Sequence, residues 1–232
     1  AADPLVESAV ETSENKAKKT AYIAHPAEIS NGKTFLLTDN GQVPIKIFGE
    51  HNLQNLQGAL NVCSSLGISS SDFYQSIQTF KGASKRQELI AKKGNSHLYR
   101  DFAHAPSKLK ATANAVKAQF PETELIAVQE LHTYSSLNKD FLPNYAGTMD
   151  AADVAVIYLN PEAVALKKLE LMDEETLREG FKRSDLKLFT NSELLLDFLL
   201  EKNYNNTNLL LMSSGNYDNM DLELIKQKFT QT

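Results

Sequence analysis

Short apolar segments alternate with helix-like segments from residue 87 to the C-terminus, and this alternation limits the possible fold more than any other feature. The expected strands lie at residues 87–91, 97–102, 124–129, 154–159, 186–189 and 208–212. The expected helices lie at residues 106–120, 138–149, 173–181, 191–201 and 218–229. Near-continuous apolar strands between helices are typical of a parallel sheet that is covered on both faces. The sequence therefore predicts an α/β domain with a mostly parallel sheet and helices on both faces.

The first 83 residues follow a different pattern. Two expected strands, 34–38 and 43–48, flank Asp39-Asn40-Gly41, a strong hairpin signal. Two expected helices follow. The first is 51–66, ended by Gly67; the second is 71–80, with Ser70 or Ser71 as its N-cap. A short helix is expected within residues 1–21. The segment 81–84 is short and contains Gly82, so the predicted domains are residues 1–83 and 84–232.

Composition excludes several classes of protein. The net charge of −5 provides no basic field for nucleic acid, and no apolar run is long enough to span a bilayer. Cys63 is the only cysteine, so no intrachain disulfide can form. The acidic N-terminal segment does not resemble a signal peptide, and we expect a cytoplasmic protein. Without a cysteine pair or clustered histidines, no structural metal site is expected.

Polar loops follow three of the expected strands. They comprise residues 101–106, 130–136 and 213–218. In an open parallel sheet, ligands bind beyond the carboxyl ends of the strands. These loops therefore predict a binding site at one edge of the sheet.

The start of the helix at 51–66 is a second candidate site. His51, Asn52 and Asn55 lie within one turn of each other beside an apolar stripe. Amides at a helix start can donate to and accept from a flat heterocycle or a phosphate. The alternative is an ordinary core helix with a polar cap.

Three further residues carry candidate chemistry. Arg86 could make forked contacts with phosphate, and its alternative is a surface ion pair with Glu88. Asp101, at a strand end, could accept both hydroxyls of a ribose; it lies too far from Pro106 to cap the following helix cleanly. His104 could act in catalysis, although a lone histidine is more often a structural hydrogen-bonding residue.

Three motifs occur in an order and spacing that resemble the Mur ligases, the ATP-dependent enzymes that add amino acids or peptides to a UDP-linked muramic acid. They are the segment 49–55 (Gly-Glu-His-Asn-Leu-Gln-Asn), the segment 86–88 (Arg-Gln-Glu) and the segment 101–106 (Asp-Phe-Ala-His-Ala-Pro). The resemblance extends from about Tyr22 to the C-terminus. It implies the C-terminal part of a central ATPase domain followed by a Rossmann-like C-terminal domain.

The phosphate-binding loop of such an ATPase domain is absent from the sequence. Asn31-Gly32-Lys33-Thr34 carries a fragment of the pattern but lacks the upstream glycine, and a strand follows it where a helix is required. The resemblance implies that this loop and a metal-binding glutamate lie upstream. We therefore expect the chain to be a C-terminal piece of a longer enzyme and to be inactive alone.

The resemblance also implies roles for individual residues. Asn52 and Asn55 would lie beside adenine with His51 next to them. Asp101 would bind the ribose, and Arg86 the terminal phosphate. His104 would lie near the nucleotide, although many relatives have a second histidine where this chain has Ala105. ATP is the implied cofactor, with Mg²⁺ held mainly by upstream residues. The implied contacts with the amine substrate are His132, Tyr134, Ser135 and Ser136.

The implied reaction is amide formation on UDP-N-acetylmuramate through an acyl phosphate. Relatives that add the first unit often carry arginine where this chain has Ser136. Its loss favours the tripeptide L-alanyl-γ-D-glutamyl-meso-diaminopimelate as the amine, in peptidoglycan recycling. The alternative is L-alanine, in peptidoglycan biosynthesis. A non-catalytic Rossmann-like binding module is an alternative of another class, and a folylpolyglutamate synthetase relative fits the His132 loop poorly.

Overall fold

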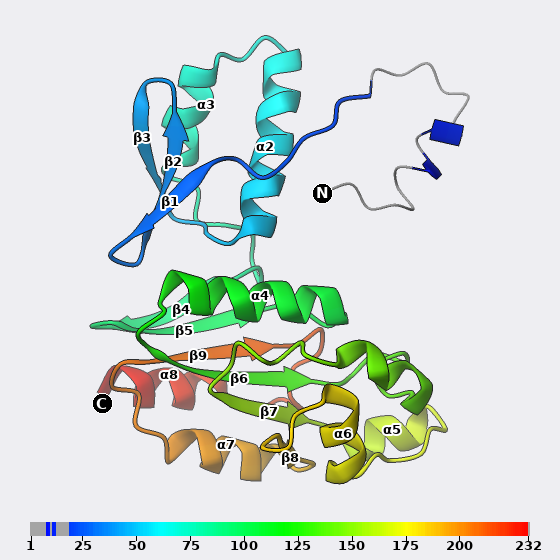
Figure 1. Cartoon of the computed structure of the whole chain (residues 1–232). Coiled ribbons are helices and arrows are strands. Elements are labelled where there is room, and N and C mark those ends of the chain that lie inside the picture. The colour runs from blue at the N-terminus through cyan, green and yellow to red at the C-terminus, as the bar shows by residue number, and fades with distance from the viewer. Residues whose placement is uncertain (1–7, 10, 13–18, 232) are drawn as a thin grey trace. The chain divides into compact units, whose positions relative to one another are not determined.

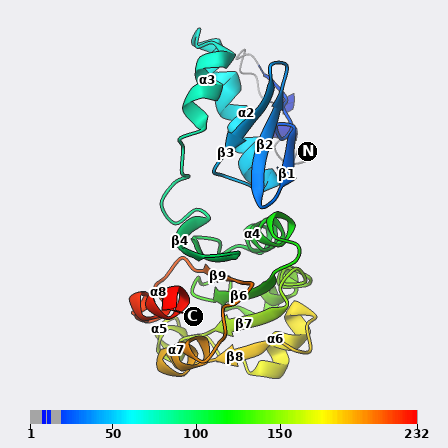
Figure 2. The same cartoon turned by 90° about the vertical axis from the view of Figure 1, so that its left-hand side faces the viewer.

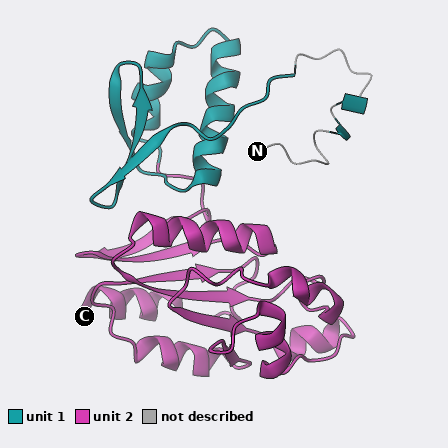
Figure 3. Ribbon diagram, in the orientation of Figure 1, with its two compact units in different colours: residues 1–80 teal, residues 81–232 magenta. Residues whose placement is uncertain are grey.

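The computed structural model describes residues 8, 9, 11, 12 and 19–231, and it divides into two compact units, Ala1–Phe80 and Lys81–Thr232 (Figure 3). The helix expected within residues 1–21 lies largely outside the described residues. No helix in the described part of the chain combines the length and apolarity needed to cross a membrane.

Unit 1 is a small antiparallel sheet packed with two helices (Figure 1). The strands are β1 (Ala27–Ser30), β2 (Lys33–Thr38) and β3 (Gly41–Ile45), in that order. The helices are α2 (Glu50–Ser65) and α3 (Ser70–Ile77). The predicted hairpin is confirmed, whereas the short, mostly exposed β1 was not expected. The core consists of Leu36, Ile45, Leu56, Leu60 and Phe73.

Glycines set both ends of α2. Gly49, with φ of 90°, precedes its first turn, and Gly67, with φ of 83°, follows its C-cap residue Leu66. Both are backbone conformations that residues with a side chain rarely adopt. The N-cap of α3 is Ser69, whose hydroxyl accepts the Asp72 N–H at 3.1 Å, so the predicted caps Ser70 and Ser71 were one or two residues too late.

Unit 2 contains a six-stranded sheet in the order β4-β5-β9-β6-β7-β8. Strands β5, β9, β6, β7 and β8 are parallel, and only the edge strand β4 is antiparallel to its neighbour. Their bounds are β4 Glu88–Lys93, β5 Ser96–Asp101, β6 Glu124–Glu130, β7 Val154–Tyr158, β8 Lys187–Phe189 and β9 Thr207–Met212. The predicted mostly parallel sheet is confirmed.

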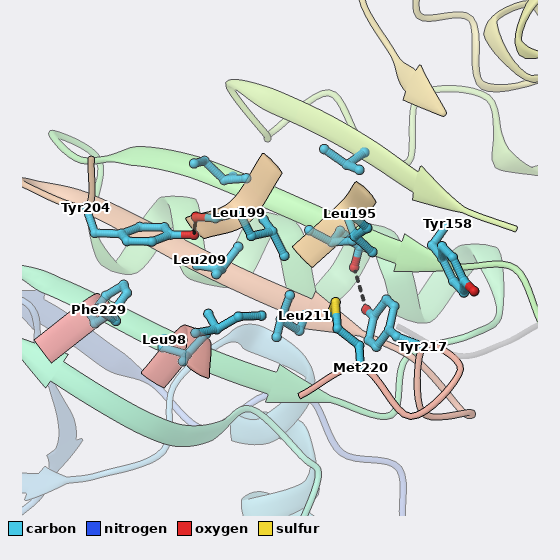
Figure 4. Close-up of a cluster of buried hydrophobic side chains, with 14 of the residues drawn as sticks. Leu98, Tyr158, Leu195, Leu199, Tyr204, Leu209, Leu211, Tyr217, Met220 and Phe229 are labelled. Atoms are coloured by element: carbon cyan, nitrogen blue, oxygen red, sulfur yellow. Dashed lines mark hydrogen bonds between the residues drawn. The ribbon is translucent and has the colours of Figure 1, made fainter. Parts of the chain in front are cut away.

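Helices cover both faces of this sheet (Figure 2). Helix α4 (Pro106–Gln119) packs on β6 and β9 from one side, and α7 (Ser192–Leu200) and α8 (Leu222–Gln231) pack on the other. The apolar side chains of α7 and α8 meet those of the strands in a buried cluster that includes Leu98, Leu195, Leu199, Leu209 and Phe229 (Figure 4). The remaining helices are α5 (Pro161–Leu166) and α6 (Glu174–Phe181). Every long apolar strand is thus buried on both faces, as the pattern predicted.

Three elements differ from expectation. The helix predicted at 138–149 is the short 3₁₀ helix η1 (Lys139–Tyr145), which contains Pro143. Proline removes a backbone donor, so a long α-helix is disfavoured there. Helix α5 was not expected. Helix α8 begins at Leu222 and not at Asp218, because residues 217–219 have positive φ values of 52°, 56° and 59°.

A buried polar cluster lies near the amino end of β5 and β9. The backbone N–H and the Nδ1 of His97 each lie 3.0 Å from Asn208 Oδ1, and Asn208 Nδ2 donates to Thr123 Oγ1 at 2.5 Å. The His97 ring is 4% exposed and stacks on Phe120 at 4.2 Å between centroids. Burial lowers the pKa of His97 below its ordinary value, with a further lowering from Lys92 and an opposing contribution from Asn208.

This lowered pKa predicts a pH-dependent stability. Between the folded pKa and the unfolded value of about 6.5, only the unfolded chain binds the His97 proton, so stability rises with pH. The contribution is complete above the unfolded pKa and is lost as pH falls towards the folded pKa. We expect the free energy of unfolding to fall by up to about 1.4 kcal/mol per pH unit in that window. Denaturant unfolding at several pH values measures the slope. His97→Gln is the control variant, and equal slopes in the two proteins would contradict the assignment.

Candidate functional site

The three polar loops meet at one edge of the unit 2 sheet. Because β5, β9 and β6 are adjacent and parallel, their carboxyl ends lie together, and the loops 101–106, 213–218 and 130–136 follow them. We call these three loops the carboxyl edge. The Ser213 N–H donates to the Asp101 carbonyl at 3.0 Å, and Tyr145 Oη donates to the His104 carbonyl at 2.8 Å. The sequence-based expectation that these loops converge is confirmed.

Asp101 holds two backbone segments at this edge. Its carboxylate is 5% exposed; Oδ2 accepts the Gln87 N–H and Oδ1 accepts the Ala103 N–H, each at 2.7 Å. Gln87 has a φ of 45° and Lys85 a φ of 54°. Such positive values are unfavourable for residues with side chains and persist only where the surroundings enforce them. Asp101 therefore stabilises the strained turn that carries Arg86.

Arg86 projects from this turn and is exposed. Its guanidinium carbon lies 5.4 Å from the centroid of the Phe102 ring. The alternative of an Arg86–Glu88 ion pair is wrong, because Glu88 pairs with Arg100 at 2.9 Å and also accepts the Lys85 N–H. The hydrogen bond from Arg100 is the main reason that the pKa of Glu88 is lowered. Arg86 thus presents its guanidinium at the surface of unit 2.

His104 contacts the same aromatic ring. Its ring meets Phe102 edge to face, with centroids 5.4 Å apart, and its Nδ1 lies 3.0 Å from the Phe102 carbonyl oxygen. A carbonyl can only accept, so the neutral ring carries its proton on Nδ1 and its lone pair on Nε2. His104 is half-buried, and Phe102 orients both it and Arg86.

The four predicted contacts with the amine substrate differ in exposure. His132 is half-buried, and its Nδ1 lies 3.8 Å from Glu130 Oε1. Tyr134 and Ser135 are exposed. Ser136 is 1% exposed, and its hydroxyl donates to the Thr133 carbonyl at 2.9 Å. Ser136 therefore closes the turn in this conformation, and the first three residues are the ones that reach the surface.

Tyr145 is buried and interacts with this loop through Ser136. Burial raises the pKa of its hydroxyl to about 12, and a hydrogen bond with Ser136 partly opposes that rise. The phenol is therefore neutral at ordinary pH and can donate to the His104 carbonyl. Through Tyr145, the loop at 130–136 is connected to the loop at 101–106.

Glu130 was missed as a site residue. It ends β6, is 3% exposed, and accepts hydrogen bonds from the Ser213 hydroxyl and, at 2.9 Å, from the Tyr217 N–H. Burial raises the pKa of Tyr217 well above its ordinary value, and the nearby Glu130 charge adds to the effect. A sequence signal did exist, because an acidic residue directly follows an apolar strand at a predicted ligand-binding edge.

The remaining candidates lie in unit 1, on the first turns of α2. His51 and Asn52 are half-buried, and Asn55 is exposed. Asn52 Nδ2 donates to the Phe48 carbonyl at 2.9 Å, which ties the start of the helix to the segment between β3 and α2. The N-cap position is Gly49, which offers no side chain, so the simple alternative of a capping side chain does not describe this helix start.

The described residues contain no group of three or more His, Cys, Asp or Glu side chains that could hold a metal ion. Within unit 2, Asp101 offers acceptors and Arg86 offers forked donors; within unit 1, the amides of α2 offer both donors and acceptors.

A Rossmann-like α/β domain with its polar site at the carboxyl ends of parallel strands is the class of protein that this geometry defines. No protein-family model matches the chain. A UDP-N-acetylmuramate–L-alanine ligase of Sulfurihydrogenibium sp. is 30% identical over 135 residues, which is 58% of this chain and 29% of that protein. One of Caldicellulosiruptor bescii is 34% identical over 115 residues, 50% of this chain and 25% of that protein.

Solved structures share the fold. The UDP-N-acetylmuramate-alanine ligase of Thermotoga maritima has a TM-score of 0.66 at 15% identity, over 88% of this chain and 45% of its own. The murein peptide ligase of Psychrobacter arcticus has a TM-score of 0.56 at 18% identity, over 88% of this chain and 44% of its own. The chain is thus similar in sequence to two UDP-N-acetylmuramate–L-alanine ligases and shares its fold with the solved ligases.

The expected closeness to the tripeptide-adding member is not confirmed, because both of these sequence relatives are L-alanine ligases. The chain spans less than a third of the length of these two relatives.

Proposed function

We propose that the chain is the C-terminal portion of an ATP-dependent amide ligase that acts on UDP-N-acetylmuramate. In this proposal, residues 1–83 complete a central ATPase domain and residues 84–232 form the C-terminal domain. The observation that carries it is the identity of 30% with an L-alanine ligase over 135 residues. The carboxyl edge of unit 2 supports it by gathering polar groups from three loops at the position where such sheets bind ligands.

ATP would convert the carboxylate of the sugar nucleotide into an acyl phosphate. Asn52 and Asn55, with His51 beside them, would contact the adenine, and Arg86 would contact the terminal phosphate. Asp101 would hold the ribose. A carboxylate is a suitable acceptor for ribose hydroxyls, and Asp101 ends β5 at the carboxyl edge. Arg86 is exposed, so its forked donors can reach an oxyanion.

The amine substrate would bind at the loop 130–136. His132, Tyr134 and Ser135 reach the surface there, and His104 lies on the neighbouring loop. We place L-alanine first as the amine because the sequence relatives are L-alanine ligases. The tripeptide L-alanyl-γ-D-glutamyl-meso-diaminopimelate is the second candidate. It is favoured by Ser136, a buried neutral residue that offers no cation to the carboxylate of free alanine.

The test is an assay of the complete enzyme with ATP, Mg²⁺ and UDP-N-acetylmuramate. Phosphate release and the mass of the product are measured with L-alanine and, separately, with the tripeptide. We expect amine-dependent phosphate release and an adduct with L-alanine. Turnover with the tripeptide alone would establish the second candidate. Absence of phosphate release with both amines would overturn the proposal and favour a non-catalytic binding module.

A further inference from the structure

Glu130 is a buried carboxylate without a permanent cation. It is 3% exposed, and among the residues that the structure describes no lysine or arginine pairs with it. Its Oε2 is occupied by the Ser213 hydroxyl and the Tyr217 N–H. Burying a charge that has hydrogen bonds but no opposite charge is costly, so such a group is rarely retained for packing alone.

The second oxygen of Glu130 lies near a partly exposed imidazole. Oε1 is 3.8 Å from Nδ1 of His132, whose side chain is 43% exposed. An imidazole is cationic only when it is protonated, so His132 does not permanently neutralise this oxygen. Glu130 Oε1 is therefore a hydrogen-bond acceptor that lies close to the half-exposed imidazole of His132.

The loop after β9 covers the same carboxylate. A Cβ at Gly215 would lie 2.8 Å from Oε2 and 2.9 Å from Oε1, so the carboxylate can occupy this place only because residue 215 has no side chain. The neighbouring Ser214 Oγ is buried and has no hydrogen-bond partner within the described part of the chain. A buried hydroxyl without a partner is uncommon in folded proteins and calls for a specific explanation.

We propose that Glu130 and Ser214 form a binding site for a primary ammonium group at the carboxyl edge, with His132 at its entrance. An ammonium has three donors and no acceptor, so it can satisfy Glu130 Oε1 and Ser214 Oγ together. An anion would be repelled by the carboxylate, and an apolar group would leave both acceptors unpaired. The site rests on the proposed function: the ligand is the α-ammonium of L-alanine, whether the amino acid is free or begins the tripeptide.

The first test uses this chain alone, without ATP or the sugar nucleotide. The probes are L-alanine and N-acetyl-L-alanine, which lacks the ammonium group, and the backbone amide signals of Gly215 and Tyr217 are followed by NMR during titration. We expect saturable shifts with L-alanine and none with N-acetyl-L-alanine. Equal shifts with the two probes, or no shift with L-alanine, would overturn the proposal. This comparison needs no variant and therefore does not depend on whether a substituted chain folds.

The second test compares two variants on one strand. Glu130→Gln keeps an acceptor for Ser213 and Tyr217 but removes the charge, and should weaken L-alanine binding at least about tenfold. Glu124→Gln makes the same change at the exposed amino end of β6 and should bind as the parent chain does. Undiminished binding by a folded Glu130→Gln protein would count against the site.

The outcome is separable from that of the ligase assay. If L-alanine binds through Glu130 but the complete enzyme releases no phosphate, the ammonium site stands and the ligase proposal fails. If the enzyme ligates L-alanine and the Glu130→Gln enzyme has an unchanged KM for it, the ligase proposal stands and the ammonium is held elsewhere.

Discussion

Replacing Arg86 with alanine in the complete enzyme should lower kcat by about 100-fold or more, with little change in melting temperature. Removing a positioned donor from a site where negative charge develops has effects of this size. The stability cost should stay within about 1 kcal/mol, because Arg86 is exposed and its one described side-chain contact is with the face of Phe102. Steady-state kinetics and thermal unfolding of the same preparation measure the two effects.

Two further variants sharpen this test. Arg86→Lys keeps the charge but loses the planar fork, so its kcat should lie between those of the parent enzyme and Arg86→Ala. Arg178→Ala removes an arginine that pairs with Glu174 on the surface of α6, far along the chain from the turn at 85–87. It should leave kcat unchanged. Full activity of Arg86→Ala would remove the phosphate role.

Replacing Asp101 with alanine should destabilise unit 2 by about 2–5 kcal/mol and also reduce ligase activity. The change leaves the N–H groups of Gln87 and Ala103 without their acceptor, and each unsatisfied buried donor costs roughly 1–3 kcal/mol. The turn that carries Arg86 would lose the contact that enforces its positive φ angles. Denaturant unfolding of this chain measures the first effect, and the assay of the complete enzyme measures the second.

A ribose-binding role alone would reduce activity and leave stability unchanged, so the expected stability loss reports the two backbone hydrogen bonds of Asp101. Asp140→Ala is a matched control, because Asp140 is exposed in η1, and it should change stability by no more than about 0.5 kcal/mol. A fully stable Asp101→Ala protein would show that the two backbone contacts contribute little. Normal turnover by that protein would argue against the ribose role as well.

Local sequence was a sound guide to the elements of unit 2. The bounds of strands such as Val154–Tyr158 were predicted to within a residue or two. An uninterrupted apolar strand must be buried on both faces, and helices on the two faces of the sheet bury it. Helix starts were marked by residues that cap through their own side chains, such as Asp173 and Asn191. Where a proline or a run of positive φ angles intervened, as at Pro143 and at residues 217–219, the predicted helices were too long.

The candidate site was predictable in outline but not in its contacts. The sequence offered an ion pair with Glu88 as the alternative role for Arg86, yet Glu88 pairs across the β4–β5 ladder with Arg100. Arg86 lies in the turn before β4, whereas Arg100 lies directly opposite Glu88 on the neighbouring strand. Glu130 was missed because its hydrogen-bond partners, Ser213 and Tyr217, lie far from it in the sequence.

The residues themselves determined that this chain has a covered parallel sheet, a small hairpin unit before it and three polar loops at strand ends, because burial, turn formation and helix capping depend on neighbours along the chain. Only the tertiary structure decided that β9 lies between β5 and β6, and therefore that the loops after Asp101, Glu130 and Met212 share one edge. Strand order depends on how helices pack across whole sheet faces, and no short stretch of sequence contains that information.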